Sequence, residues 1–93
     1  MKKNVLEEVC DYLKEIEAVE SESECSVDWL GRSEGYMRVL RFKRAQPSIG
    51  TLAICANKLF YYGDKFKNDE HKGDVVLALL QLGESCNRQV NGY

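Results

Sequence analysis

The chain has 93 residues and a formal net charge of −2, from 13 Lys and Arg against 15 Asp and Glu. A chain of this length is expected to form one domain, residues 1–93, around one modest core. Hydrophobic residues make up 44% and charged residues 30%, as in globular proteins rather than disordered or fibrous ones. These values exclude a second domain, a transmembrane protein and an enzyme that buries a large cofactor.

The N-terminal segment lacks the pattern of an export signal, because Glu7, Glu8 and Asp11 interrupt any apolar stretch. No run of residues approaches the roughly 18 apolar residues that a membrane-spanning helix needs. We therefore expect a cytoplasmic protein without a membrane partner.

The four cysteines are spread along the chain at Cys10, Cys25, Cys55 and Cys86. They form no CxxC pair, which argues against a zinc ribbon or a thioredoxin-like site. A disulfide framework is an alternative, because their number is even. The missing export signal and the apolar neighbours of three of the cysteines favour buried free thiols instead.

Both ends of the chain are predicted to be helical. The first helix is expected over about residues 4–20, where apolar side chains recur at helical spacing from Leu6 to Ile16. Asn4 followed by Glu7 is a capping pattern, which marks the beginning of this helix.

The second predicted helix spans about residues 74–90, with Asp74 as its N-cap and a stop at Asn91-Gly92. Gly83 lies on its apolar stripe, where a missing side chain permits close approach. Apolar residues extend nearly all round the first turns, so the helix is expected to be buried on two sides. One side would face the sheet, and the other would face the first helix or a second copy in a homodimer.

The middle of the chain is predicted to form strands, at about residues 25–30, 36–44, 51–56 and 59–62. Alternation of apolar and polar residues supports the first strand. The second segment breaks the alternation, so a β-bulge at Val39–Leu40 would be needed to turn its apolar side chains inward. An amphipathic helix is the alternative there, but the aromatic content and the flanking glycine favour a strand.

The last two strands are predicted to form a hairpin with its turn at Asn57-Lys58. A helix that begins at Pro47 is the alternative, but Gly50 and the aromatic cluster favour the hairpin. The elements then follow the order α-β-β-β-(β)-α. This is an α+β fold, in which an antiparallel sheet carries the N- and C-terminal helices on one face.

Charge is divided along the chain rather than spread evenly. Residues 7–28 hold nine acids and one base, a net charge of −8. Residues 32–67 hold eight bases and two acids, a net charge of +6. Solvated faces that pair with each other would explain this division without any function. The functional interpretation is a surface with two charged poles, which steers a partner of opposite sign or a second copy.

Motifs for catalysis and for metal binding are weak. Residues 31–35 match the G-x-S-x-G pattern of hydrolase nucleophiles, but Ser33 is better explained by a glycine-rich loop because no helix is predicted after it. The single histidine, His71, lies in a hydrophilic segment without the apolar surroundings that tune a catalytic pKa. We therefore predict that the protein is not an enzyme and has no cofactor or metal site.

The expected function is that of a small non-enzymatic protein-binding module of the inhibitor, adaptor or chaperone type. In size and charge the chain resembles phage-encoded inhibitors of host defence and small bacterial secretion chaperones. Exposed Tyr and Arg are typical of interface anchors. The side chains predicted to contact the partner are aromatic or basic residues from the middle of the chain and acids of the first helix: Tyr36, Arg38, Arg41, Lys43, Arg44, Tyr61, Glu7, Glu8, Asp11 and Glu15.

A nucleic-acid-binding domain is the alternative, because aromatic and basic side chains are interleaved in residues 36–67. On a sheet, such aromatics can stack on bases while Arg and Lys contact phosphates. The order α-β-β-β-α resembles that of double-stranded-RNA-binding domains, which carry a lysine-rich start to the last helix. Residues 68–74 are net acidic instead, so a protein partner is favoured over a nucleic acid.

Overall fold

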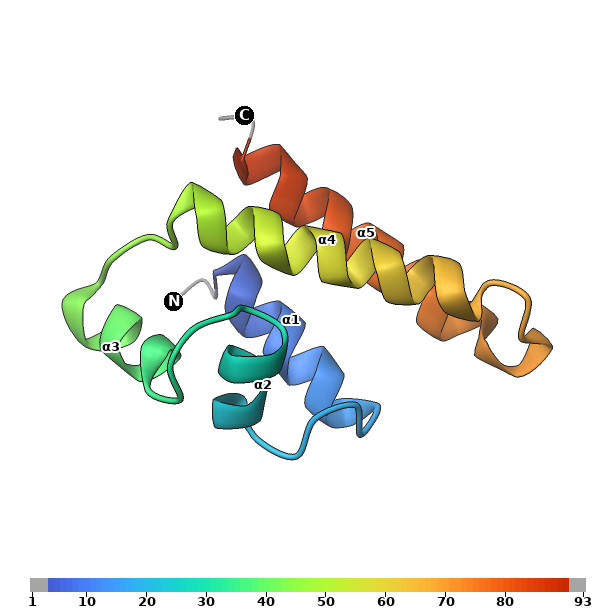
Figure 1. The fold of residues 1–93 in the computed structure, drawn as a ribbon, viewed down its shortest axis with the longest axis horizontal. Helices are drawn as coiled ribbons and strands as arrows, with labels where there is room; N and C mark the ends of the chain where they lie inside the picture. Colours follow the sequence, from blue (N-terminus) through green and yellow to red (C-terminus); the bar gives the residue numbers. More distant parts are fainter. Residues whose placement is uncertain (1–3, 91–93) are drawn as a thin grey trace.

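The computed structural model describes residues 4–90, which form five α-helices and one short 3-10 helix (Figure 1). The two long helices α4 and α5 lie side by side and run antiparallel, and α1, α2 and α3 pack beside them. The elements in chain order are α1 (Val5–Glu15), α2 (Glu22–Asp28), α3 (Tyr36–Lys43), α4 (Ile49–Phe66), η1 (Glu70–Lys72) and α5 (Gly73–Val90).

The predicted α+β fold with an antiparallel sheet is wrong, since residues 4–90 contain no strand. Helix α2 occupies most of the first predicted strand and α3 nearly all of the second, while α4 covers the whole predicted hairpin. Asn57-Lys58, predicted as the turn, lies in the middle of α4. Apolar spacing explains this result, because Leu52, Ala56 and Leu59 recur at intervals of four and three residues and are all buried.

Side-chain caps mark where two of these helices begin. The Ser21 hydroxyl accepts a hydrogen bond from the Glu24 N–H at 3.1 Å, and α2 follows directly. The Ser48 hydroxyl accepts one from the Thr51 N–H at 3.2 Å at the beginning of α4. Each cap satisfies a backbone donor that the first turn of a helix leaves unpaired. The Ser21 cap favours a helix over a strand at α2, where the apolar pattern is short.

The predicted first helix is confirmed, but α1 is shorter than expected. Its cap is the predicted one, because Asn4 Oδ1 accepts a hydrogen bond from the Glu7 N–H at 2.9 Å. The helix ends near Ile16 because Glu17 adopts a left-handed conformation with φ of 62°. The chain then folds back, and Val19 is buried beyond the end of the helix.

The second predicted helix is also confirmed, as α5. It begins at Gly73, directly after η1, so Asp74 is its second residue and not its N-cap. It packs mainly against α4 and also against α1. The predicted stop at Asn91-Gly92 lies outside the described residues.

The contact between α4 and α5 is close because glycines stand where side chains would collide. A Cβ atom at Gly83 would lie 2.9 Å from Cε1 of Phe60, and a Cβ at Gly63 would lie 2.9 Å from Cδ2 of Leu80. Real Cβ atoms essentially never approach other atoms so closely. The predicted role of Gly83 in close approach is therefore confirmed, and Gly63 has the same role on α4.

All four cysteines are buried, as expected, but they are not all free thiols. Cys10 and Cys25 form a disulfide between α1 and α2, which corrects the prediction for this pair. Cys55 of α4 and Cys86 of α5 keep free thiols. A hydrogen bond with Cys86, together with burial, raises the pKa of the Cys55 thiol and keeps it protonated. The spacing of the cysteines in the sequence could not show which two form the bond. Cys10 and Cys25 become neighbours only when α1 packs against α2 in the fold.

Gly83→Val is expected to lower the free energy of unfolding by about 1–3 kcal/mol, because the new side chain would overlap the Phe60 ring. The matched control is Gly50→Val, since a Cβ there meets no atom within 4 Å. The control should change the free energy by less than about 0.5 kcal/mol. Urea unfolding measures both variants, and equal stabilities would contradict the close α4–α5 contact.

Reduction of the Cys10–Cys25 bond is expected to lower the free energy of unfolding by about 3 kcal/mol, because the bond spans 15 residues of chain. Urea unfolding with and without a thiol reductant measures the difference. A Cys55→Ala chain should show the same dependence on reductant, since its missing thiol takes no part in the bond. Identical unfolding midpoints in both conditions would contradict the prediction.

Candidate functional site

Helix α3 buries one face in the core and presents a basic and apolar face to solvent. Met37 and Leu40 point inward and are buried. Arg38, Val39 and Phe42 lie on the opposite face at helical spacing, and the Phe42 side chain is 89% exposed. A large apolar side chain held in water next to arginine is typical of a contact surface.

The segment between α2 and α3 is an ordered turn. Leu30 is fully buried, and Gly31 follows it with φ of +66°, a conformation that glycine adopts at little cost. The Arg32 N–H then donates to the Ser26 carbonyl at 2.9 Å. The Tyr36 N–H donates to the Ser33 carbonyl at 3.1 Å, where α3 begins. Ser33 thus lies in a loop, and a helix does follow it, contrary to expectation.

The guanidinium of Arg32 anchors this turn to the beginning of α4. Its Nε–H donates to Thr51 Oγ1 at 2.8 Å, and its Nη2–H donates to Ser48 Oγ at 3.2 Å. The same guanidinium lies 5.4 Å from the centre of the Tyr36 ring. Tyr36, predicted as an exposed partner contact, is therefore half-buried and supports the turn.

Arg41 connects α3 to α2 through a bidentate ion pair. Its guanidinium donates to the two carboxylate oxygens of Glu22 at 2.6 and 2.9 Å. This hydrogen bond lowers the pKa of the Glu22 carboxyl and raises that of Arg41. The nearby carboxylates of Glu7 and Asp11 on α1 also raise the pKa of Arg41. The predicted contact residue Arg41 is thus engaged within the fold, and two of the predicted acids stand close to it.

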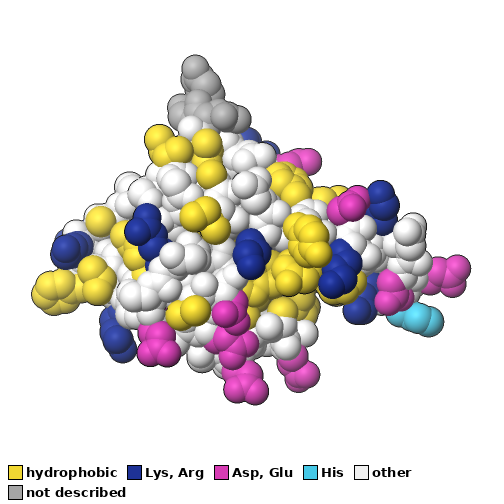
Figure 2. All heavy atoms as spheres, in the orientation of Figure 1, with side chains coloured by type: hydrophobic (Ala, Val, Ile, Leu, Met, Phe, Trp, Pro, Cys, Tyr) yellow, Lys and Arg dark blue, Asp and Glu magenta, His cyan; other side chains and the backbone are white. Residues whose placement is uncertain are grey.

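The remaining predicted contact residues fall on separate surfaces. Lys43 and Arg44 are exposed at the end of α3, near Arg38 in the chain. Glu8 and Glu15 are exposed on α1. In Figure 2, acidic side chains gather along the lower edge, below α1 and α2 in Figure 1, while basic and apolar side chains surround the end that carries α3.

Tyr61 belongs to neither of these surfaces. It lies on the outer side of α4 with its side chain 60% exposed, edge-on to Tyr62. The ammonium of Lys65 lies 6.0 Å from its ring centre. Tyr61 lines a shallow groove with Ile54 and Lys58. The ten predicted residues therefore do not form one binding face.

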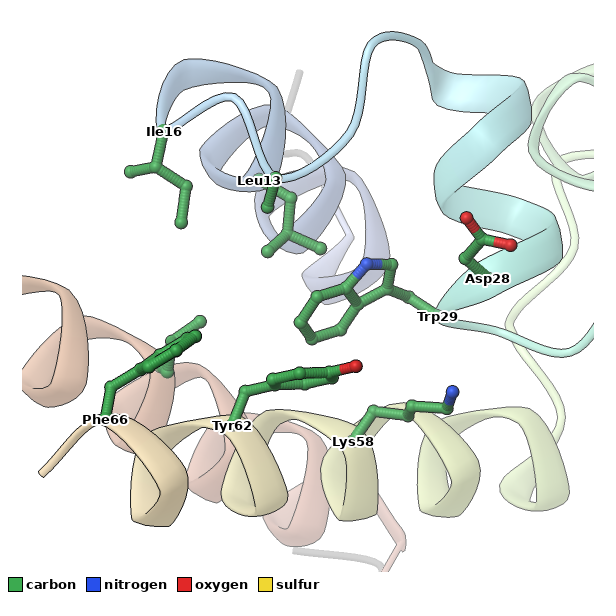
Figure 3. Close-up of a pocket in the computed structure, with 9 residues that line it drawn as sticks. Leu13, Ile16, Asp28, Trp29, Lys58, Tyr62 and Phe66 are labelled. Carbon is green, nitrogen blue, oxygen red and sulfur yellow. The ribbon is translucent and has the colours of Figure 1, made fainter.

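A pocket of about 360 Å³ between α1, the end of α2 and α4 was not predicted (Figure 3). Its walls include Trp29, whose ring centre lies 5.0 Å from that of Tyr62, and Phe66, which stacks on Tyr62 at 6.0 Å. Asp28 and Lys58 stand at the opposite end from Phe66. Lys58, Tyr62 and Phe66 recur at intervals of four residues, and this helical spacing could have revealed the α4 wall of the pocket. The predicted elements there are instead a turn at Lys58, a strand at Tyr62 and no regular element at Phe66.

Other classes of site have no support in residues 4–90. No group of three or more His, Cys, Asp or Glu side chains there could hold a metal ion. His71 lies exposed in η1, as its hydrophilic surroundings predict. None of the helices in this part of the chain has the length and apolar character needed to cross a membrane.

Loss of the Glu22 charge is expected to lower the free energy of unfolding only at pH values at which that carboxyl is ionised. Its pKa is lowered in the folded state, so the Arg41 pair contributes stability above the ordinary Glu pKa and loses it as pH falls through the folded value. Glu22→Gln should lower the free energy of unfolding by less than about 1 kcal/mol at pH 7, since the pair is partly exposed. The difference should shrink as pH falls below the ordinary Glu pKa and vanish once the folded-state carboxyl is protonated.

Urea unfolding of the Glu22→Gln chain across this pH range provides the measurement. Glu20→Gln is the matched control, because Glu20 is exposed and forms no ion pair within the described part of the chain. A Glu22→Gln effect that stays constant from pH 7 to below the Glu pKa would contradict the role of the ion pair.

Comparison with known proteins places the chain in a family but assigns no activity. No curated protein and no solved structure gives a match. A family profile described as a family of unknown function, DUF6626, matches residues 6–92. This range spans all the helices described above except the first residue of α1. The chain therefore belongs to the DUF6626 family.

Proposed function

We propose that this protein binds double-stranded DNA, with α2 and α3 as a helix-turn-helix unit and α3 in the major groove. The observation that carries the proposal is the outward face of α3, formed by Arg38, Val39 and Phe42, opposite the buried Met37 and Leu40. In a helix-turn-helix unit the second helix presents its outer side chains to base edges while the first crosses the backbone.

The connection between the helices supports this assignment. Residues 29–35 join the two short helices; this connection is longer than the three- or four-residue turn usual in the motif, but it contains a left-handed glycine, Gly31, as such turns often do. The buried Leu30 and the Arg32 bonds to α4 hold the turn in place. The Arg41–Glu22 pair holds α3 against α2. A recognition helix needs such support, because base contacts require a fixed orientation.

The chemistry of α3 suits a duplex. An arginine such as Arg38 can donate two hydrogen bonds to a guanine edge, and side chains such as Phe42 can contact a thymine methyl group. Residues 36–44 contain four bases and no acid, and Lys43 and Arg44 are exposed where phosphates would lie. The acids of α1 would repel phosphates, so they favour a single orientation with α3 toward the DNA.

This proposal departs from the favoured sequence-based hypothesis of a protein-binding module, which becomes the second candidate. The groove beside Tyr61, with Ile54 44% exposed in it, favours a protein contact on the outer side of α4. Self-association through α5 also stays a prediction. Leu77 is the large apolar side chain of α5 that is strongly exposed, at 58%. In both candidates the protein is not an enzyme; the Cys10–Cys25 disulfide argues against the expected cytoplasmic location, because such bonds are rare in the cytosol.

Fluorescence anisotropy with a labelled DNA duplex of mixed sequence tests the proposal across a series of salt concentrations. The unchanged chain should bind the duplex at low salt and release it as salt rises. Arg38→Ala should weaken binding about tenfold or more, as expected for a lost base contact. Lys43→Ala should weaken binding to all sequences and reduce the salt slope by about one.

Two matched variants serve as controls for these measurements. Lys67→Ala removes a cation that pairs with Asp64 far from α3 along α4, and Tyr61→Ala removes the exposed aromatic of the outer groove. Both should leave the duplex affinity unchanged. Absence of duplex binding at about 50 mM salt, or equal losses for Arg38→Ala and Lys67→Ala, would refute DNA binding through α3.

A further inference from the structure

The pocket beside Trp29 has polar groups at one end that the fold leaves unused. Asp28, at the end of α2, and Lys58, on α4, are exposed and both line it, and neither side chain forms an ion pair or hydrogen bond within residues 4–90. The same holds for the hydrogen-bonding groups of the Trp29 indole and the Tyr62 hydroxyl. Figure 3 shows Asp28 and Lys58 beyond Trp29, on opposite helices at the same end of the pocket.

The other end of the pocket is apolar. Leu13 and Ile16 of α1 face Phe66 of α4 there (Figure 3). Ligand pockets are mostly apolar, with a few polar groups that orient the ligand. A volume of about 360 Å³ is near the lower end of the range for such sites, roughly 300–1,000 Å³. This size and this division of the lining would suit a small molecule with an apolar body and a polar head.

We propose that this pocket binds a free α-amino acid with a large apolar side chain. The ammonium of the ligand would pair with the Asp28 carboxylate, and its carboxylate would pair with the Lys58 ammonium. The indole N–H of Trp29 and the Tyr62 hydroxyl are further donors for the ligand carboxylate. The apolar side chain would extend between Leu13, Ile16 and Phe66.

Charge complementarity selects this ligand over others. One anionic and one cationic side chain at the same end of the pocket match a head group whose ammonium and carboxylate are bonded to the same carbon. A fatty acid or a peptide C-terminus offers only the negative charge, so it would leave Asp28 unpaired. An amine or a peptide N-terminus would leave Lys58 unpaired. Asp28 and Lys58 are both exposed, so an unpaired one keeps its hydration, and each of these ligands should bind more weakly because it forgoes one charge-assisted hydrogen bond.

The location of the pocket links it to α3. Asp28 is the last residue of α2 and Trp29 is its C-cap, so a bound ligand would hold the end of α2 against α4. The turn to α3 follows directly at Leu30 and Gly31. Through this link a ligand would stabilise the orientation of α3 and raise the affinity for DNA. This last step rests on the proposed function, whereas ligand binding itself does not.

Calorimetric titration of the full chain without DNA tests the ligand. The probes are the L-amino acids leucine, methionine, phenylalanine and tryptophan, with lysine and aspartate as polar comparisons. At least one apolar amino acid should bind saturably, and the polar ones should not. Trp29 is the single tryptophan of the chain, so its fluorescence should change on the same titration curve for ligands that lack an indole.

Head-group analogues and variants make the test specific. The decarboxylated amine and the N-acetylated form of the bound amino acid should each bind about tenfold more weakly or worse, as should the Asp28→Asn and Lys58→Met chains to the amino acid itself. Asp64→Asn and Lys67→Met are the matched controls, because these residues pair with each other at the end of α4, outside the pocket. The controls should retain full affinity.

The outcomes separate the two proposals. Absence of saturable binding by every apolar amino acid, or an amine that binds as tightly as its amino acid, would overturn the ligand assignment whatever the DNA experiments give. Unchanged affinity in both Asp28→Asn and Lys58→Met, with thermal unfolding confirming that they fold, would do the same. A chain that binds the amino acid but no duplex would refute only the DNA proposal.

Discussion

The close contact between α4 and α5 is the constraint on which the other parts of the structure depend. Because Gly63 and Gly83 carry no side chain, Phe60 and Leu80 can fill the space between the two helices. Two long helices packed this closely form a rigid support, since protein interiors are dense and resist deformation. Helix α1 packs against α5, and Trp29 at the end of α2 contacts Tyr62 of α4.

The position of α3 depends on this support indirectly, through its contacts with neighbouring segments. Only two of its side chains, Met37 and Leu40, are buried, so apolar packing alone gives it a small share of the core. Polar contacts complete its placement, with Arg32 joined to Thr51 of α4 and Arg41 joined to Glu22 of α2. Individually such partly exposed contacts contribute little stability, but together they orient the helix. A fixed orientation is what the proposed contact with DNA requires.

The charge division of the chain is partly explained by ion pairing within the fold. Arg41 pairs with Glu22 and lies near acids of α1, so part of the opposite charge is neutralised inside the fold. Arg38, Lys43 and Arg44 remain exposed on or just after α3. Which basic residues are available to a partner depends on these contacts, and no property of the sequence alone distinguishes Arg41 from Arg38.

The sequence alone determined the two terminal helices, the cap at Asn4, the contact role of Gly83 and the burial of the cysteines, because long amphipathic segments carry an unambiguous period. It did not determine the middle of the chain. Segments as short as α2 and α3 fit a strand or a helix equally well by apolar pattern, and short isolated helices are marginal in water. The Ser21 cap of α2, the packing of α2 against α1 and the packing of α3 against α2 decided between the two. Tertiary structure also chose the disulfide partners and assembled the pocket around Trp29, since both join residues far apart in the chain.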